Sequence, residues 1–99
     1  MMDGKASVAT DVLASYAADA ALEVEGVARL VDGRLPRHAA VRVDSEDGAR
    51  IELHVELAWG APAREVGAEV QRRVANYLER MAGTRPRAVD VVVDEIRAR

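Results

Sequence analysis

Cysteine and phenylalanine are absent from this chain of 99 residues, and aromatic residues make up only 3% of it. Without cysteine, the protein has no disulfide bond and no thiolate zinc site. With so few aromatic residues, its core must be built from Val, Leu, Ile and Ala, because hydrophobic residues still make up 49% of the chain. Side chains of this size suit two thin layers packed on each other, and they leave little room for a large ligand cavity.

An excess of positive charge is also missing. The formal net charge is −3, and 31% of the residues are charged. A modestly acidic chain is not a general nucleic-acid binder, because phosphate contacts need a concentrated positive surface. The first residues contain no apolar run behind a basic one, and Asp19 and Glu23 interrupt the Ala-rich residues 12–24. We therefore expect no signal peptide, no direct membrane insertion and a cytoplasmic location.

The length predicts one small domain over residues 1–99, with a core from 4 to 96 and frayed ends. Residues 4–9 are interpreted as a short extended segment. Ser7 or Thr10 can cap the helix that follows, because a hydroxyl oxygen accepts hydrogen bonds from the free amides of a first turn. Gly26 is placed to end this helix in a left-handed cap. The helix is predicted by apolar residues at helical spacing, namely Val12, Leu13, Tyr16, Ala17, Ala20, Ala21 and Val24.

Strict alternation of apolar and polar residues predicts a strand over residues 50–58, because successive side chains of a strand point to opposite faces. A shorter alternating run covers residues 40–44, and Asp47-Gly48 between the two runs favours a tight turn. We interpret the two runs as an antiparallel hairpin. Residues 27–31 are predicted to be a further short strand, with a turn at Asp32-Gly33.

The second half of the chain is predicted to be a strand, a helix and a strand. Gly60-Ala61-Pro62 ends the first strand, and Pro62 suits the first helical position because the amide that it lacks has no partner there. Gly83 stops the helix, and residues 88–93 form the last strand. The apolar stripe of the helix consists of Ala63, Val66, Val70, Val74, Tyr77, Leu78 and Met81.

This order of elements predicts an α+β domain of two layers. A helix between two neighbouring strands of one sheet usually makes a right-handed parallel crossover. We therefore expect two helices on one face of a small mixed β-sheet, with the strand-helix-strand crossover in the C-terminal half.

Glu52, His54 and Glu56 share one face of the predicted strand, and Asp90 and Asp94 are expected on the same face of the sheet. Carboxylate and imidazole groups are metal ligands. However, successive residues on one face of a strand lie about 7 Å apart, whereas a small metal ion needs its ligand atoms at about 2 Å. This face is therefore a solvated surface, a partner surface or a metal site, in falling order of preference.

Arginines gather on the polar side of the second helix and just after it. They are Arg64, Arg72, Arg73, Arg80, Arg85 and Arg87. Such a stripe can bind phosphates. Glutamates at positions 65, 69 and 79 interrupt it, and no aromatic residues lie among the arginines to stack bases. A mixed, salt-bridged face is favoured over a nucleic-acid site.

Trp59, the single tryptophan, lies between a strand and a helix. It either covers the end of the core or contacts another subunit, because large amphipathic rings are favoured at interfaces. Val92 stands on an otherwise polar strand face, and His38 follows Pro36 in a surface loop. No glycine-rich phosphate loop and no nucleophile motif is present, so the sequence predicts no catalytic residue, cofactor or small-molecule substrate.

Several segments carry a resemblance to a known family. They are residues 23–30 (Glu-Val-Glu-Gly-Val-Ala-Arg-Leu), Trp59-Gly60 at a strand end, residues 79–83 (Glu-Arg-Met-Ala-Gly), the valine-rich residues 89–93, and Gly4 and Val12 near the start. In combination they resemble the alkaline shock protein (Asp/Gls) family of bacterial envelope stress response proteins, over residues 4–96.

The chain departs from the family pattern at Thr84, where a leucine is common, and at Arg85-Pro86-Arg87, which is more basic than expected. The resemblance implies a small, cytoplasmic, non-enzymatic protein linked to cell-envelope homeostasis. It supplies no catalytic residues.

The residues and the resemblance together predict a protein-protein interaction or self-assembling scaffold domain. Its expected partners are a second copy of the chain, a membrane-associated protein, or both. Two alternatives stay open: a nucleic-acid-binding module that uses the Arg-rich helix, and a small metal-binding protein or enzyme. The candidate surface comprises Glu52, His54, Glu56, Trp59, Arg72, Arg73, Arg80 and Val92.

Overall fold

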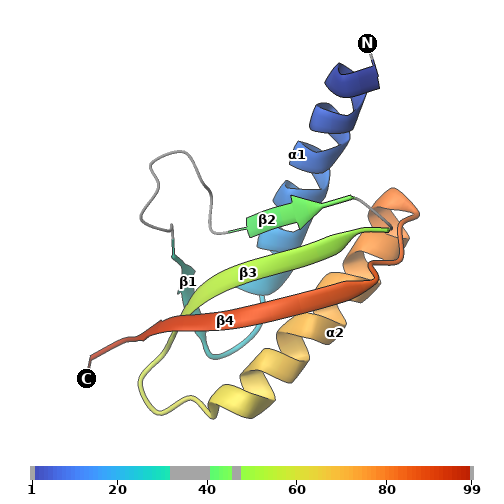
Figure 1. The fold of residues 1–99 in the computed structure, drawn as a ribbon. Helices are drawn as coiled ribbons and strands as arrows, with labels where there is room; N and C mark the ends of the chain where they lie inside the picture. The colour runs from blue at the N-terminus through green and yellow to red at the C-terminus, as the bar shows by residue number, and fades with distance from the viewer. Residues whose placement is uncertain (1, 32–40, 46–47, 99) are drawn as a thin grey trace.

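Two helices pack on one face of a four-stranded sheet (Figure 1). The computed structural model describes residues 2–31, 41–45 and 48–98, with the backbone alone for residues 2–9. The elements in chain order are α1 (Met2–Leu22), β1 (Val27–Leu30), β2 (Val41–Asp44), β3 (Arg50–Leu57), α2 (Ala63–Ala82) and β4 (Ala88–Ile96). The predicted two-layer α+β fold is confirmed.

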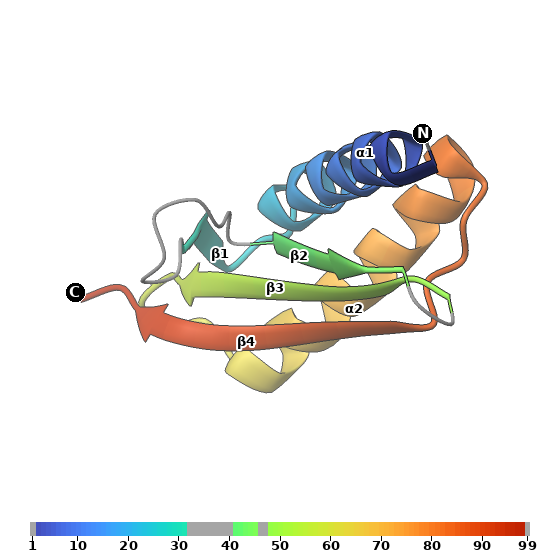
Figure 2. The ribbon, with the colours of Figure 1, turned by 45° about the horizontal axis from the view of Figure 1, so that its top comes forward.

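Strand β3 lies at the centre of the sheet, and every other strand pairs with it. β4 runs parallel to β3 along one edge over its whole length. β2 and β1 pair antiparallel with the other edge, β2 beside the first half of β3 and β1 beside the second half (Figure 2). The predicted hairpin and the predicted parallel crossover through α2 are both present, so the sheet is mixed.

The core lies between β3 and the two helices. Ile51, Leu53, Val55 and Leu57 of β3 are at most 1% exposed. The alternation along β3 places these four side chains on the helix-covered face, as the sequence predicts. The helices meet them with smaller side chains: Leu13, Ala17, Ala20, Ala21 and Val24 of the α1 segment, and Val66, Val70, Val74 and Leu78 of α2.

The two helices also contact each other through their tyrosines. The rings of Tyr16 and Tyr77 lie edge to face, with centroids 5.7 Å apart and planes at 84°. This arrangement brings the positive edge of one ring to the negative face of the other. Of the residues predicted for the apolar stripes, Val12 and Met81 are 41% and 47% exposed and lie outside the core.

The start of the chain differs from the prediction. Residues 4–9 belong to α1, which begins at Met2, so neither Ser7 nor Thr10 caps its first turn. None of the four strands of the described sheet includes residues 4–9. Alanine and lysine in this segment favour a helix. The predicted turns at Asp32-Gly33 and at Asp47 lie outside the described residues, as does His38.

Both ends of α2 follow from local chemistry. Pro62 is the N-cap rather than the first helical residue, with an extended backbone. Gly83 is the C-cap in the left-handed conformation (φ 67°), and its amide donates to the carbonyl of Glu79 at 3.1 Å. The glycine stop is therefore confirmed, because glycine adopts this conformation without a steric penalty.

Pairing with β3 extends further than predicted, into residues 96 and 97 of the end that was expected to be frayed, while Arg99 lies outside the described residues. β4 continues to Ile96, and the amide of Arg97 donates to the carbonyl of Leu57 at 2.8 Å. The prediction was wrong because it used the valine pattern alone, whereas backbone pairing with β3 continues past the last valine.

Gly26 lies in the turn after α1, where this turn contacts the start of α2. The helix ends at Leu22, and Gly26 follows in a turn with φ 103°. A Cβ atom at this position would lie 2.7 Å from Cγ2 of Val66. The carbonyl of Gly26 accepts a hydrogen bond from the amide of Ala58 at 2.8 Å. Glycine is therefore required here both by the backbone angle and by the close approach of α2.

We predict opposite effects of alanine at two glycines. Gly26→Ala will destabilise the fold by about 1–2 kcal/mol or more, because it combines a left-handed backbone with an overlap against Val66. Gly67→Ala will stabilise it by about 1 kcal/mol, because Gly67 lies within α2 with nothing within 4 Å of an added Cβ. Urea unfolding monitored by circular dichroism measures both values. A stable Gly26→Ala variant would contradict this account.

Candidate functional site

The face of the sheet away from the helices carries ion pairs across its strands. We call it the charged face, and its residues come from β1, β2, β3, β4 and the segment after β4. Opposite charges lie beside each other across neighbouring strands, as in Arg50 and Asp90, whose side chains approach to 3.5 Å. Its members are Arg29, Arg42, Asp44, Arg50, Glu52, His54, Glu56, Asp90, Val92, Asp94, Glu95 and Arg97.

His54 lies between two carboxylates on this face. Its Nε2 atom is 2.6 Å from Glu52, and its Nδ1 atom is 2.7 Å from Asp94. Both ring nitrogens donate only in the protonated imidazole, so this geometry favours the charged form. The hydrogen bond to Glu52, together with that to Asp94, raises the pKa of His54 above 6.5. The protonated form of His54 therefore links β3 to β4 through its two hydrogen bonds.

Glu56 is the single buried charged residue of the described core, and only 6% of it is exposed. It accepts hydrogen bonds from Nε of Arg29 at 2.8 Å and from Nε of Arg97 at 2.9 Å. Arg97, followed by Arg29, lowers the pKa of Glu56 below 4.5. A carboxylate held by two guanidinium groups satisfies the requirement that a buried charge be paired.

The two strands that flank Glu56, β1 and β4, both change register there. Ala28 is an extra residue in β1 between the pairs at Val27 and Arg29, and Asp94 is an extra residue in β4. Such bulges bend a strand and redirect its side chains. Here the bulge in β4 allows Asp94 to reach His54, while the next residue, Glu95, lies 3.5 Å from Arg29.

These contacts divide the predicted metal ligands into two groups. Glu52 and His54 are brought together with Asp94, whereas Glu56 binds two arginines instead. Among the residues that the structure describes, no three His, Cys, Asp or Glu side chains are arranged to hold a metal ion. The arrangement does not favour the metal-binding alternative.

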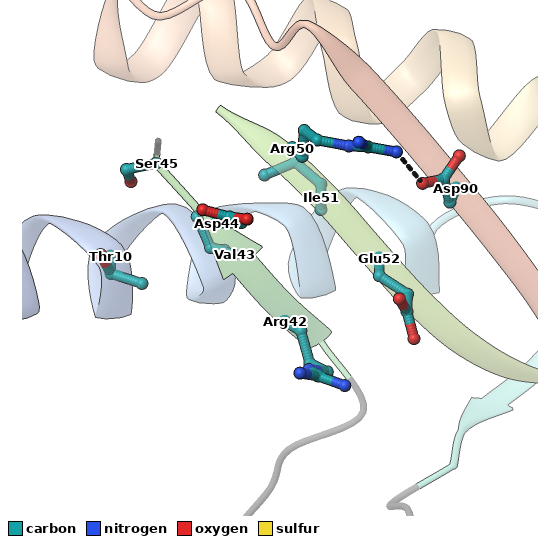
Figure 3. A pocket seen from close by; sticks show the side chains of 9 residues that line it. All are labelled: Thr10, Arg42, Val43, Asp44, Ser45, Arg50, Ile51, Glu52 and Asp90. Carbon is teal, nitrogen blue, oxygen red and sulfur yellow. Dashed lines mark ion pairs between the residues drawn. The ribbon is translucent and has the colours of Figure 1, made fainter. Parts of the chain in front are cut away.

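A polar hollow opens at the start of β3, with a volume of about 460 Å³ (Figure 3). Side chains from α1, β2, β3 and β4 line it, so no single sequence motif predicts it. Its two arginines, Arg42 and Arg50, alternate with the carboxylates of Asp44, Glu52 and Asp90. Because neither sign of charge dominates, the hollow is not selective for an anion or a cation. Figure 3 shows the ion pair between Arg50 and Asp90 beside it.

The arginines of α2 are largely paired with neighbouring groups. Arg72 and Arg73 both donate to Glu69, at 2.6 and 2.9 Å. The hydrogen bond from Arg72 is the larger cause, and that from Arg73 the second, of a pKa of Glu69 below 4.5. Arg80 lies over the ring of Tyr77 at 5.6 Å, and Arg85 pairs with Glu79 at 3.1 Å. The expected mixed, salt-bridged face is confirmed for these residues, which does not favour the nucleic-acid alternative.

Trp59 does not cover the core, because 61% of it is exposed. It lines a second hollow of about 460 Å³, which we call the Trp59 hollow. Carboxylates and small apolar side chains contribute the rest of the lining. They include Glu25, Glu65, Glu69, Ala61, Pro62 and Val66.

Sequence reasoning missed Arg29 and Arg97 as members of the charged face. They are distant from Glu56 in the chain, by 27 and 41 positions. Only the register of β1 and the continuation beyond β4 bring them together. Val92, which was predicted for this face, lies opposite His54 and is partly exposed.

The comparison with protein families identifies the kind of protein. The family model of the alkaline shock proteins, described by a cell envelope-related function, matches residues 1–98. The chain belongs to this family, as the resemblance of its segments indicates. No curated protein and no solved structure matched the chain. In the described parts of the chain, neither helix is long and apolar enough to span a membrane.

We predict that the pKa of His54 depends on Asp94. Asp94→Asn removes one of the two carboxylates that favour the imidazolium, so the pKa will fall towards 6.5. Stability from this contact is present below pH 6.5 and is lost as the pH rises through the raised pKa. NMR titration of the ring signals measures this shift, in a His38→Asn background that leaves one histidine. Asp90→Asn, which touches Arg50 instead, is the control, and equal midpoints in both variants would contradict the prediction.

We predict that Glu56→Gln lowers the melting temperature at pH 7, because it leaves Arg29 and Arg97 without their carboxylate. Stability from Glu56 is present above pH 4.5 and is lost as the pH falls through its lowered pKa. The variant will therefore lose less stability on acidification than the parent. Glu95→Gln, at an exposed position, is the control and will change stability by less than about 0.5 kcal/mol. Parallel melting curves of both variants across pH would refute the role of Glu56.

Proposed function

We propose that this family member serves the cell envelope as a non-enzymatic scaffold that associates with further copies of itself through the free edge of β4. The observation that carries the proposal is the long, partly apolar edge strand. A membrane-associated protein is the second partner that we propose, with the scaffold itself on the cytoplasmic side.

The free edge belongs to the longest strand of the sheet. β4 has nine residues and pairs with β3 alone within the part of the chain that the structure describes. Figure 1 shows it at the border of the sheet, with β3 on one side and no described strand on the other. The carbonyl of Val89 in β4 accepts a hydrogen bond from the side chain of Gln71 at 2.8 Å. Unpaired backbone groups elsewhere on such a border are a template for pairing with another strand.

The side chains of β4 support association rather than protection of the edge. Val93 is 39% exposed and Ile96 is 62% exposed. Proteins that keep an edge strand monomeric often place charged residues or proline on it; β4 carries Asp90, Asp94 and Glu95 but no lysine or proline. The exposed valine and isoleucine therefore favour contact with a second apolar edge.

The charged face supports a role in specificity rather than in chemistry. Both nitrogens of His54 are occupied by carboxylates, and Glu56 is held by two arginines. Groups committed in this way are not available as a general base or a nucleophile. The carboxylates of β4, Asp90, Asp94 and Glu95, would instead limit the register of a partner strand, because like charges opposite each other are unfavourable.

We predict that Val93→Lys with Ile96→Lys weakens self-association about tenfold or more, because pairing at the edge would bury two unpaired charges. Light scattering and sedimentation over a range of concentrations measure the association. Val12→Lys, which adds one lysine at an exposed position of α1, is the control and will leave association unchanged. Circular dichroism will check that all variants are folded. A monomeric parent at high concentration, or an unaltered double variant, would overturn the proposal.

A further inference from the structure

The Trp59 hollow lies apart from the charged face, where the end of β3 meets the start of α2. The turn after α1 lies against it, because the carbonyl of Gly26 accepts the amide of Ala58 and Gly26 approaches Val66. Gly60 and Pro62 then separate β3 from α2. Two segments that are distant in the sequence, the turn after α1 and residues 58–69, therefore meet around one exposed tryptophan.

The charges around the Trp59 hollow are acidic. Glu25, Glu65 and Glu69 line it, and no basic residue does. Glu69 is held by Arg72 and Arg73. Glu25 and Glu65 have no ion pair or side-chain hydrogen bond to any residue that the structure describes. These two carboxylates are therefore available to a cation that enters the hollow.

The apolar part of the lining suits a cation at the end of a long aliphatic side chain. Ala61, Pro62 and Val66 offer short aliphatic surface beside the ring of Trp59. A long side chain can lay its methylene groups on such a surface while its charged end stays at the rim. A cation over a tryptophan ring is attracted to the negative face of the ring.

From this complementarity of charge and shape, we propose that the Trp59 hollow is a docking site for an arginine side chain on a peptide segment of a partner protein. The guanidinium group stacks on Trp59, and its N–H groups donate to Glu25 and Glu65. Arginine suits the site better than lysine because its planar group stacks on aromatic rings and donates to two carboxylates at once.

This site is independent of self-association through β4. Its lining comes from the turn after α1, the end of β3 and the start of α2, and it contains no residue of β4. The Val93→Lys, Ile96→Lys variant is therefore expected to bind the arginine peptide as the parent does. Failure of one proposal would leave the other testable.

The test uses a capped, fluorescein-labelled peptide Gly-Ala-Arg-Ala-Gly and the full chain. The anisotropy of the labelled peptide measures binding. In a second measurement, unlabelled peptide is added and the fluorescence of Trp59 is followed. Trp59 is the single tryptophan, so its emission reports on this hollow directly. We expect saturable binding that weakens with salt and shifts the Trp59 emission. The same peptide with citrulline in place of arginine keeps the shape without the charge, and it will not bind.

Three variants locate the binding site. Glu25→Gln with Glu65→Gln will weaken binding about fivefold to tenfold, and Trp59→Leu will weaken it in the anisotropy assay. Asp11→Asn with Glu79→Gln removes the same charge from exposed positions outside the hollow and will leave binding unchanged. All substituted residues are exposed, and circular dichroism will confirm folding. Equal binding of the citrulline peptide, equal weakening by both double variants, or binding without a change at Trp59 would each overturn the proposal.

Discussion

The fold depends on one strand that is buried on one face and paired along both edges. Ile51, Leu53, Val55 and Leu57 of β3 are almost fully enclosed by the helices, and each side chain of this size stabilises the core by about 1.5–3 kcal/mol relative to exposure. Because side chains alternate along a strand, the same burial forces the charged residues of β3 onto the opposite face. The core and the charged face are therefore two consequences of one pattern, and β1, β2 and β4 each find their register against it.

The charged face is specified by pairing across strands. Glu56 is nearly buried and would be costly without Arg29 and Arg97, because an unpaired buried charge destabilises strongly. The two ion pairs of Glu56 also connect the segment after β4 to β1, at the point where β1 and β4 each contain a bulge. His54 joins β3 to β4 in a similar way, but that link weakens as the pH rises through the raised pKa of His54. Glu56 therefore contributes stability above pH 4.5, whereas the contribution of His54 is lost as the pH rises.

Two outward surfaces remain once these contacts are made. The free edge of β4 presents backbone groups with exposed Val93 and Ile96, and the Trp59 hollow presents an aromatic ring with two free carboxylates. One favours a like strand and the other favours a cationic side chain. The chain belongs to a family with a cell envelope-related function, and we propose that the two surfaces let it join copies of itself to a different partner.

The two-layer fold could be predicted from the sequence because each of its signals is local: the alternation of residues 50–58, the apolar stripe of α2, and the glycine that ends it. The helical start at Met2 was missed because a short run of small residues has no clear period, and the anchoring of Arg97 was missed because it depends on a neighbouring strand. By itself the sequence determined the core side of β3, most of the core side of the helices, and the face of β3 that carries Glu52, His54 and Glu56. Only the tertiary structure decided that Glu56 binds two arginines, that His54 binds Asp94, and that Trp59 stays exposed beside Glu25 and Glu65. The physical reason is that these side chains meet through strand register, bulges and the close approach of Gly26 to α2, and none of these has a signature within one segment of the chain.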